Sequence, residues 1–168
     1  FIKLMQSLPR EVIDALIVVN DGERYPEIEM FDCAVHHNEE NQGVGRSKNI
    51  ALRWLQQQQV EHYFLIEDDI YIKNPDVFLR YIELSLKTGI QHFNFSQHGP
   101  NNHLADGTPQ PRLEVACHDL TLPLYPICVG AFCYFSARCF QTVGLFDEYY
   151  YNAVEHLDHT LAIIHAGM

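Results

Sequence analysis

The sequence lacks an apolar run of membrane-spanning length and has few basic side chains, and both absences exclude classes of protein. Only 11 Lys and Arg accompany 22 Asp and Glu, so the formal net charge is -11 at pH 7. This surplus of negative charge argues against a protein that binds the phosphate backbone of nucleic acids. Repeats and linker-like segments are also absent, and 168 residues suffice for one domain with a single core.

A disulfide framework is not indicated, because the number and the spacing of the cysteines argue against it. The chain has five cysteines, an odd number, and none forms a Cys-x-x-Cys pair. They are Cys33, Cys117, Cys128, Cys133 and Cys139. We therefore expect ordinary buried thiols in a reducing compartment, which indicates a cytoplasmic location.

The pattern of apolar residues and turn residues predicts an α/β domain. Segments with helical spacing alternate with short β-branched or aromatic runs. Predicted helices span 1–8, 47–58, 75–87, 136–143 and 153–166, and predicted strands span 15–19, 30–35, 63–66, 92–95, 124–129 and 131–135. Residues 97–112, rich in Gly, Pro, Asn and His, are expected to form a long surface loop.

Three carboxylates follow directly on the apolar run 63–66. Glu67, Asp68 and Asp69 would repel one another at the end of a buried strand. A hard divalent cation with oxygen ligands relieves such repulsion, so this cluster is a candidate metal site. The alternative is a solvated corner whose carboxylates cap the next segment.

A second strand also ends in acidic and turn residues. The run 15–19 leads into Asn20-Asp21-Gly22-Glu23, in which glycine allows the chain to reverse. Ligands of open α/β sheets bind outside the carboxyl ends of the strands. We therefore expect Asp21 and the 67–69 cluster to line one crevice.

A glycine-rich segment, 41–45, leads into the predicted helix 47–58. Arg46 and Lys48 lie close to the start of that helix. Backbone N–H groups and cations at a helix N-terminus suit an anionic phosphate. The segment is not a P-loop, because no Gly-Lys-Ser/Thr follows at the required spacing.

Taken together, these segments resemble the GT-A glycosyltransferases, and in particular glycosyltransferase family 2. Asn20–Glu23 resembles the nucleotide-contacting turn of that family, and Glu67–Asp69 its Asp-x-Asp metal motif. Asn41-x-Gly43 with Lys48-Asn49 is similar to its Asn-x-Gly and Arg-Asn element. Gly144-Leu145-Phe146-Asp147-Glu148, followed by Glu155 and Asp158, resembles its Gly-x-Phe-Asp-Glu segment and the acidic helix that supplies the catalytic base.

The resemblance implies a GT-A (Rossmann-like) fold, with a mixed, mostly parallel sheet flanked by helices. It implies a metal-dependent, inverting transfer of a sugar from a nucleotide-diphosphate sugar, with UDP as nucleotide, to an acceptor hydroxyl in glycan or polysaccharide synthesis. The implied donor-binding residues are Asn20, Asp21, Arg46, Lys48, Glu67 and Asp68. Asp69 is the implied ligand of Mn²⁺ or Mg²⁺, and Glu155 or Asp158 the implied base.

Several residues depart from the family pattern. Asn20 stands where relatives have Asp, and Glu23 where they have Ser. Glu155 is followed by His156 where relatives have Glu-Asp, which leaves the identity of the base open. Relatives begin with a buried strand ahead of the helix predicted at 1–8. We therefore expect this single catalytic domain to be a fragment of a longer protein, without its first strand.

Other interpretations of the same residues stay open. Asn152 and Glu155 have the spacing of a capping box, and His156, His159 and His165 would need a further ligand to form a zinc site. A nucleotidyltransferase also combines an α/β sheet with metal-bound carboxylates. A catalytically silent module that binds sugar nucleotides within a larger assembly protein is the second alternative.

Overall fold

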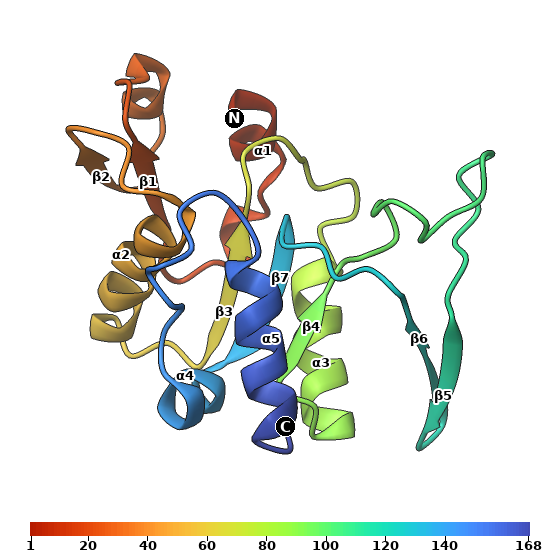
Figure 1. Ribbon diagram of the computed structural model, residues 1–168. Coiled ribbons are helices and arrows are strands. Elements are labelled where there is room, and N and C mark those ends of the chain that lie inside the picture. The colour runs from red at the N-terminus through yellow and green to blue at the C-terminus, as the bar shows by residue number, and fades with distance from the viewer.

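Runs rich in apolar residues form most of the strands, and segments with apolar residues three and four positions apart form the helices. Figure 1 shows these elements in the computed structural model of residues 1–168. The larger elements are α1 (Ile2–Ser7), β1 (Ile17–Asp21), β2 (Ala34–Asn38), α2 (Val44–Gln57), β3 (His62–Ile66), α3 (Val77–Thr88), β4 (His92–Asn94), β5 (Leu113–Cys117), β6 (Leu120–Leu124), β7 (Phe132–Ser136), α4 (Ala137–Val143) and α5 (Glu155–His165). Short 3₁₀ turns cover Arg10–Val12 and Pro26–Met30.

The central sheet has the order β3-β7-β4, and β7 runs antiparallel to both neighbours. The first four residues of β7 are buried, and Tyr134 is fully so. Apolar residues of α2, α4 and α5 pack on one face of this sheet, and those of α1 and α3 on the other. The sheet is therefore the middle layer of an α/β sandwich, because both of its faces are apolar.

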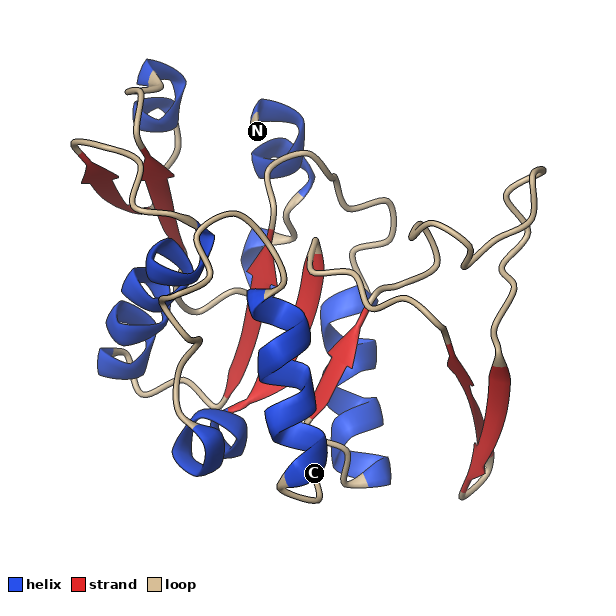
Figure 2. Cartoon of the chain, in the orientation of Figure 1, coloured by secondary structure: helices blue, strands red, loops and turns tan.

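The other two sheets have two strands each. β1 and β2 form a parallel pair, whereas β5 and β6 form an antiparallel hairpin. In Figure 2 this hairpin lies at the end of two long connections, and its turn is tied to α3 by an ion pair between Asp119 and Lys87 at 2.6 Å. None of the helices has both the length and the apolar character needed to cross a membrane.

The prediction of an α/β domain is confirmed, but a mostly parallel sheet is not what forms. Only β1 and β2 pair in parallel. β3 and β4 run in the same direction, yet they never meet, because the antiparallel β7 lies between them. A strand inserted with the opposite direction thus turns the expected parallel ladder into an antiparallel one.

All five predicted helices form, with ends that differ by a few residues, and the run 97–112 has no helix or strand. The predicted strand 124–129 is wrong, because only 120–124 of this region is extended and paired, as β6. The sequence also did not predict β5. Its partner β6 contains Pro123, a residue that breaks central strands but is tolerated in a two-stranded hairpin with open edges.

Candidate functional site

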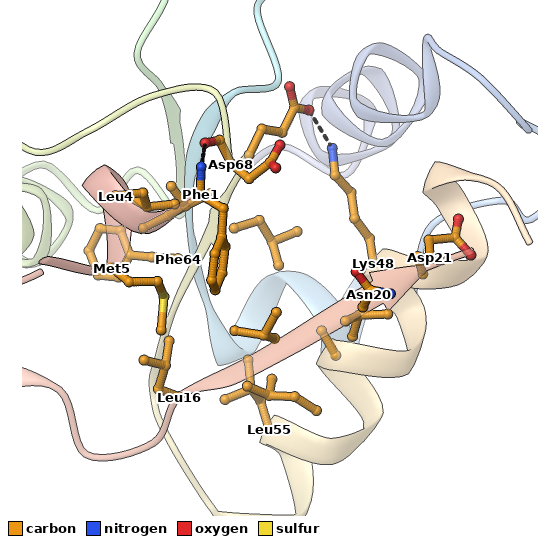
Figure 3. A pocket seen from close by; sticks show the side chains of 18 of the residues that line it. Phe1, Leu4, Met5, Leu16, Asn20, Asp21, Lys48, Leu55, Phe64 and Asp68 are labelled. Atoms are coloured by element: carbon orange, nitrogen blue, oxygen red, sulfur yellow. Dashed lines mark hydrogen bonds and ion pairs between the residues drawn. The ribbon is translucent and has the colours of Figure 1, made fainter. Parts of the chain in front are cut away.

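The carboxyl ends of β1 and β3 lie along one cavity of about 680 Å³ (Figure 3). The polar side chains on its wall come from three of the predicted motifs. They are Asn20, Asp21, Ser47, Lys48, Glu67 and Asp68. The remaining wall is mostly apolar and extends between the two strands, so the cavity has a charged mouth and a hydrophobic interior.

Lys48 joins two acidic segments that are far apart in the sequence. Its Nζ lies 2.7 Å from Glu155 Oε1 and 3.1 Å from Glu67 Oε1, and Figure 3 shows the side chain reaching along the mouth of the cavity. We refer to these three residues as the Lys48 junction. Burial lowers the pKa of Lys48, but the two carboxylates outweigh it, so the pKa lies above its usual value.

Glu155 is almost completely buried, with 1% of the residue exposed. Burial raises its pKa, but hydrogen bonding to His156 and the charge of Lys48 outweigh burial and lower the pKa to about 2. A carboxylate with this pKa is fully ionised at neutral pH and a weak proton acceptor. In the observed arrangement its proton affinity is therefore poorly suited to general-base catalysis.

The capping box considered as an alternative role for Asn152 and Glu155 does not form at the start of α5. The N-cap residue is Val154, no side chain caps the helix, and Glu155 is its first residue. Val154 adopts φ +67, a left-handed conformation that is unusual for a β-branched residue. The side chain of Glu155 bonds to Lys48 instead of completing such a box, so it connects α5 to α2.

Asp21 holds the loop that precedes α2. Its Oδ1 accepts hydrogen bonds from Gln42 N and Asn38 Nδ2, both at 2.7 Å, and its Oδ2 accepts one from Gly43 N at 3.0 Å. Burial raises the pKa of Asp21, but these bonds together lower it. The carboxylate thus shapes the mouth of the cavity as well as lining it.

Asn20 closes the turn after β1. Its Nδ2 donates to Glu23 O at 2.8 Å, and Gly22 within this turn has φ +109. Glycine adopts such a conformation at little cost, which explains its place here. The structure therefore places Asn20 at the cavity with its amide already engaged.

The start of α2 is not open to a phosphate in the way that the glycine-rich sequence suggested. Val44 N donates to Tyr151 O at 2.8 Å, and Gly45 N donates to Tyr150 O at 3.3 Å. A Cβ at Gly43 would lie 2.7 Å from Tyr151 O, so glycine permits this close contact. The glycines serve packing between α2 and the 147–151 segment, and two amide donors are consumed by it.

Arg46 and Lys48 lie in different surroundings although the sequence grouped them. Arg46 is half exposed and bonds to Gln42 Oε1 at 2.8 Å and Glu148 Oε2 at 3.3 Å. It does not line the cavity, whereas Lys48 does. Of the two predicted phosphate-binding cations, only Lys48 is therefore positioned at the cavity mouth.

Asn49 joins two further motifs, and its role was not predicted. Its Oδ1 accepts from Phe146 N at 3.0 Å, and its Nδ2 donates to Phe146 O at 2.9 Å and Glu148 Oε1 at 3.1 Å. The residue is 1% exposed. One hint of this role was visible in the sequence, because Asn49 follows Lys48 directly in the same turn of α2. Lys48 contacts Glu155, and Asn49 contacts Phe146 and Glu148.

The other two acidic residues after β3 are exposed. Asp68 lines the cavity and its backbone carbonyl accepts a hydrogen bond from the amino group of Phe1, whereas Asp69 lies outside the lining. Neither side chain forms an ion pair, and no group of three His, Cys, Asp or Glu side chains converges as ligands. Two free carboxylates suit a cation such as Mg²⁺ that takes its remaining ligands from water and a substrate phosphate.

Asp158 and the histidines of α5 differ sharply in exposure. Asp158 is exposed and its charge raises the pKa of Tyr150. His159 is 3% exposed, bonds to Gly144 O at 2.9 Å through Nε2, and packs against aromatic side chains of the core. His165 is exposed, so the three histidines considered as a zinc site do not gather at one point.

Comparison with protein-family models, with curated proteins and with solved structures finds no match for this chain.

Proposed function

We propose that this chain is the catalytic domain of a metal-dependent glycosyltransferase that moves a sugar from a UDP-sugar, or another nucleotide-diphosphate sugar, to an acceptor hydroxyl. The supporting observation is the Lys48 junction. It brings together, within hydrogen-bond distance, the helix after the glycine-rich segment, the acidic end of β3 and the acidic start of α5. Three segments that resemble one family's motifs thus share a single cation at the mouth of one cavity.

The polar residues at the mouth have complementary tasks in this proposal. Asp21 shapes the nucleotide-facing loop through its bonds to Gln42 and Gly43, and Asp68 faces the ribose. Asp69 would hold Mn²⁺ or Mg²⁺ together with the donor phosphates. When bound, the cation supplies positive charge that stabilises the departing diphosphate.

Lys48 couples donor binding to the pKa of the base, Glu155. A diphosphate at the cavity mouth carries more negative charge than Glu155 and competes for the Lys48 ammonium group. Once Lys48 moves toward the phosphate, Glu155 loses a partner that lowers its pKa. Glu155 then becomes a better acceptor for the hydroxyl proton of the attacking acceptor, which is the task of the base in an inverting transfer.

Asp158 is the alternative base, because it is exposed in the first turn of α5 and forms no ion pair that would have to break. A catalytically silent sugar-nucleotide-binding module is the second candidate function. The observation that favours it is the burial and ion pairing of Glu155, an arrangement that holds the domain together without chemistry. The glycosyltransferase and the silent module both require donor binding, but only the glycosyltransferase requires sugar transfer.

The decisive experiment is calorimetric titration of the chain with a panel of nucleotide sugars, with and without Mn²⁺. A glycosyltransferase binds one donor selectively and more tightly with Mn²⁺, and it releases free nucleotide when an acceptor is present. Selective binding without any release over a broad acceptor panel supports the silent module. Absence of binding by every nucleotide sugar and by UDP contradicts both candidates.

A further inference from the structure

The β5–β6 hairpin has one apolar face and one more polar face. Residues that lie opposite each other across an antiparallel pair share the same side of it. One face carries small or polar side chains, among them Glu114 and its neighbour across the ladder, Pro123. The register puts six apolar side chains on the other face: Leu113, Val115, Cys117, Leu120, Leu122 and Leu124.

The rest of the chain covers this hairpin poorly. None of its strand residues is buried, and Leu113, Val115 and Leu124 are 56%, 39% and 48% exposed. The ion pair between Lys87 and Asp119 ties its turn to α3, but exposed pairs contribute little stability. A two-stranded hairpin is marginally stable unless further strands or a helix support it. The hairpin therefore calls for a further partner.

A proline decides which edge of the hairpin can accept another strand. Pro123 in β6 is the register partner of Glu114 in β5. Because proline has no N–H group, these two residues cannot exchange both backbone hydrogen bonds. Bonded and non-bonded pairs alternate along an antiparallel ladder. Glu114 and Ala116 therefore direct their backbone groups to the outer edge of β5, whereas Thr121 and Pro123 direct theirs to the outer edge of β6.

The two edges differ in what they offer. The edge of β6 lacks a donor at Pro123 and lies on the side of the domain body, whereas β5 forms the outer side of the hairpin in Figures 1 and 2. No strand pairs with this side of β5. An open edge with regular N–H and C=O groups is a template for a strand of another chain.

The sequence of β5 suits pairing with itself. In an antiparallel pair of two copies centred on Val115, all five residues of each strand overlap. Glu114 then lies opposite Ala116 of the partner subunit, and these two residues can exchange both backbone hydrogen bonds. The two Val115 side chains meet at the centre, and no like charges lie opposite each other. One patch thus serves both copies, as a two-fold axis requires.

We propose that β5 is a dimerisation strand, which pairs antiparallel with β5 of a second copy of the chain and merges the two hairpins into one four-stranded sheet. Such a sheet has enough strands to support an apolar face. Leu113 and Val115 gain apolar neighbours across the new ladder. The hairpin contributes no residue to the cavity, so this contact is independent of the proposed donor site.

Sedimentation velocity of the full chain over a range of concentrations tests the dimer. Ala116→Pro removes a donor that faces the outer edge of β5 and leaves the bonds within the hairpin intact. Two hydrogen bonds are lost in each dimer, so its dissociation constant should rise at least about tenfold. Thr121→Pro is the matched control, because Thr121 is the register partner of Ala116 and faces the other edge. It should change the dissociation constant by less than about twofold.

Charge variants test the register without a proline. Ala116→Lys places a lysine opposite Glu114 of the partner subunit, twice in each dimer, and should tighten the dimer at least about twofold. Ala116→Glu places like charges there and should weaken it. Leu122→Lys puts a charge on the apolar face of β6, away from the β5 edge, and should weaken the dimer less than Ala116→Pro does.

A chain that stays monomeric up to about 1 mM overturns the proposal, because a second copy is then not the occupant of the edge. Equal weakening by Ala116→Pro and Thr121→Pro overturns the choice of β5. Equal dissociation constants for Ala116→Lys and Ala116→Glu overturn the register. Loss of the dimer in Leu122→Lys, with its retention in Ala116→Pro, assigns the contact to the apolar face and overturns the edge pairing.

Discussion

The Lys48 junction contains a buried carboxylate, Glu155, whereas the carboxylates of Asp69 and Asp158 lie in the opposite environment, exposed to solvent. Within the junction, Glu155 is buried and bonded to Lys48, and its pKa is lowered to about 2. Asp69 and Asp158 are exposed and form no ion pair. The buried carboxylate therefore contributes to stability as well as to any activity, whereas the exposed carboxylates are accessible to a ligand.

The largest expected effect tests whether the buried carboxylate also does chemistry. Glu155→Gln keeps the size of the side chain but cannot accept a proton, so we expect sugar transfer to fall about a hundredfold to ten-thousandfold. The UDP dissociation constant should change far less. Transfer rate and UDP affinity are measured on the same preparation, by nucleotide release and by calorimetry.

Asp158→Asn is the matched control for that change, because it neutralises an exposed carboxylate in the same helix turn. Normal transfer by the Glu155 variant with loss of transfer by the Asp158 variant assigns the base to Asp158. If both variants transfer normally, α5 is structural and the inverting mechanism lacks its proton acceptor.

A second prediction concerns the stability of the junction. Lys48→Met leaves Glu155 as a buried charge without its cation, and removing one partner of a buried pair costs about 3–5 kcal/mol of unfolding free energy. Arg46→Met is the control, because Arg46 forms an exposed ion pair with Glu148, and such pairs contribute at most about 1 kcal/mol. Urea unfolding of both variants measures the difference.

The double variant Lys48→Met/Glu155→Leu makes this test stricter. Replacing both charges with apolar groups removes the unpaired charge, so much of the lost stability should return. Equal costs for Lys48→Met and Arg46→Met would show that the junction is no more coupled than a surface ion pair.

The junction also predicts a dependence of stability on pH. The pKa of Glu155 is about 2 in the folded chain, below its ordinary value of 4.5. A lowered pKa stabilises the folded state above the ordinary value, and this contribution is lost as the pH falls from about 4.5 toward 2. The difference in unfolding free energy between the wild type and Glu155→Gln should narrow over that range. A constant difference would mean that the charge of Glu155 does not stabilise the fold.

Asp69 offers the opposite test, in which function changes and stability does not. We expect Asp69→Asn to weaken the Mn²⁺-dependent part of UDP binding about tenfold to a hundredfold, an effect typical of damage to a metal site. Its unfolding free energy should stay within about 0.5 kcal/mol of the wild type, because the side chain is exposed. Asp119→Asn, in the distant β5–β6 turn, is the control, and unchanged metal dependence in Asp69→Asn removes the site assignment.

The sequence predicted those parts of the fold that depend on local pattern. Apolar residues at helical spacing are sufficient to identify α2 and α3, and the β-branched run at 15–19 identifies β1. The direction of β7 was not predictable, because its apolar residues suit a buried strand of either direction. The hairpin β5–β6 lacked a two-residue Asn-Gly or Asp-Gly signal, since its turn contains His118 and Asp119.

The candidate site shows the same division between local pattern and long-range contact. Clusters of acidic and glycine residues were visible in the sequence, and the structure brings Asp21, Lys48 and Glu67 to one cavity. The pairing of Lys48 with Glu155 spans 107 positions along the chain, so no local rule predicts it. Nor does the sequence reveal that the amides of Val44 and Gly45 are consumed by carbonyls of the 147–151 segment.

The smallest expected effect comes from the loop 97–112, which contributes no residue to the cavity. Its base is held by Asn102, whose Nδ2 donates to Ser96 O at 2.6 Å and Ile127 O at 2.7 Å, and its tip beyond the His103–Pro109 bridge is exposed. Replacing residues 104–108 with Asn-Gly shortens the tip and leaves Asn102 in place. UDP affinity should therefore change by less than about twofold, since exposed loop tips tolerate shortening.

Acceptor use is the property that this shortening should alter, because loops that follow sheet strands commonly carry binding residues. The measurement is the transfer rate over a panel of acceptors at saturating donor, beside UDP titration of the same variant. Asn102→Ala is the comparison, since it removes the buried anchor and releases the whole loop, not only its tip. A large loss of UDP affinity in the shortened variant would instead place the loop at the donor. The expectation that this loop serves the acceptor and not the donor would then be wrong.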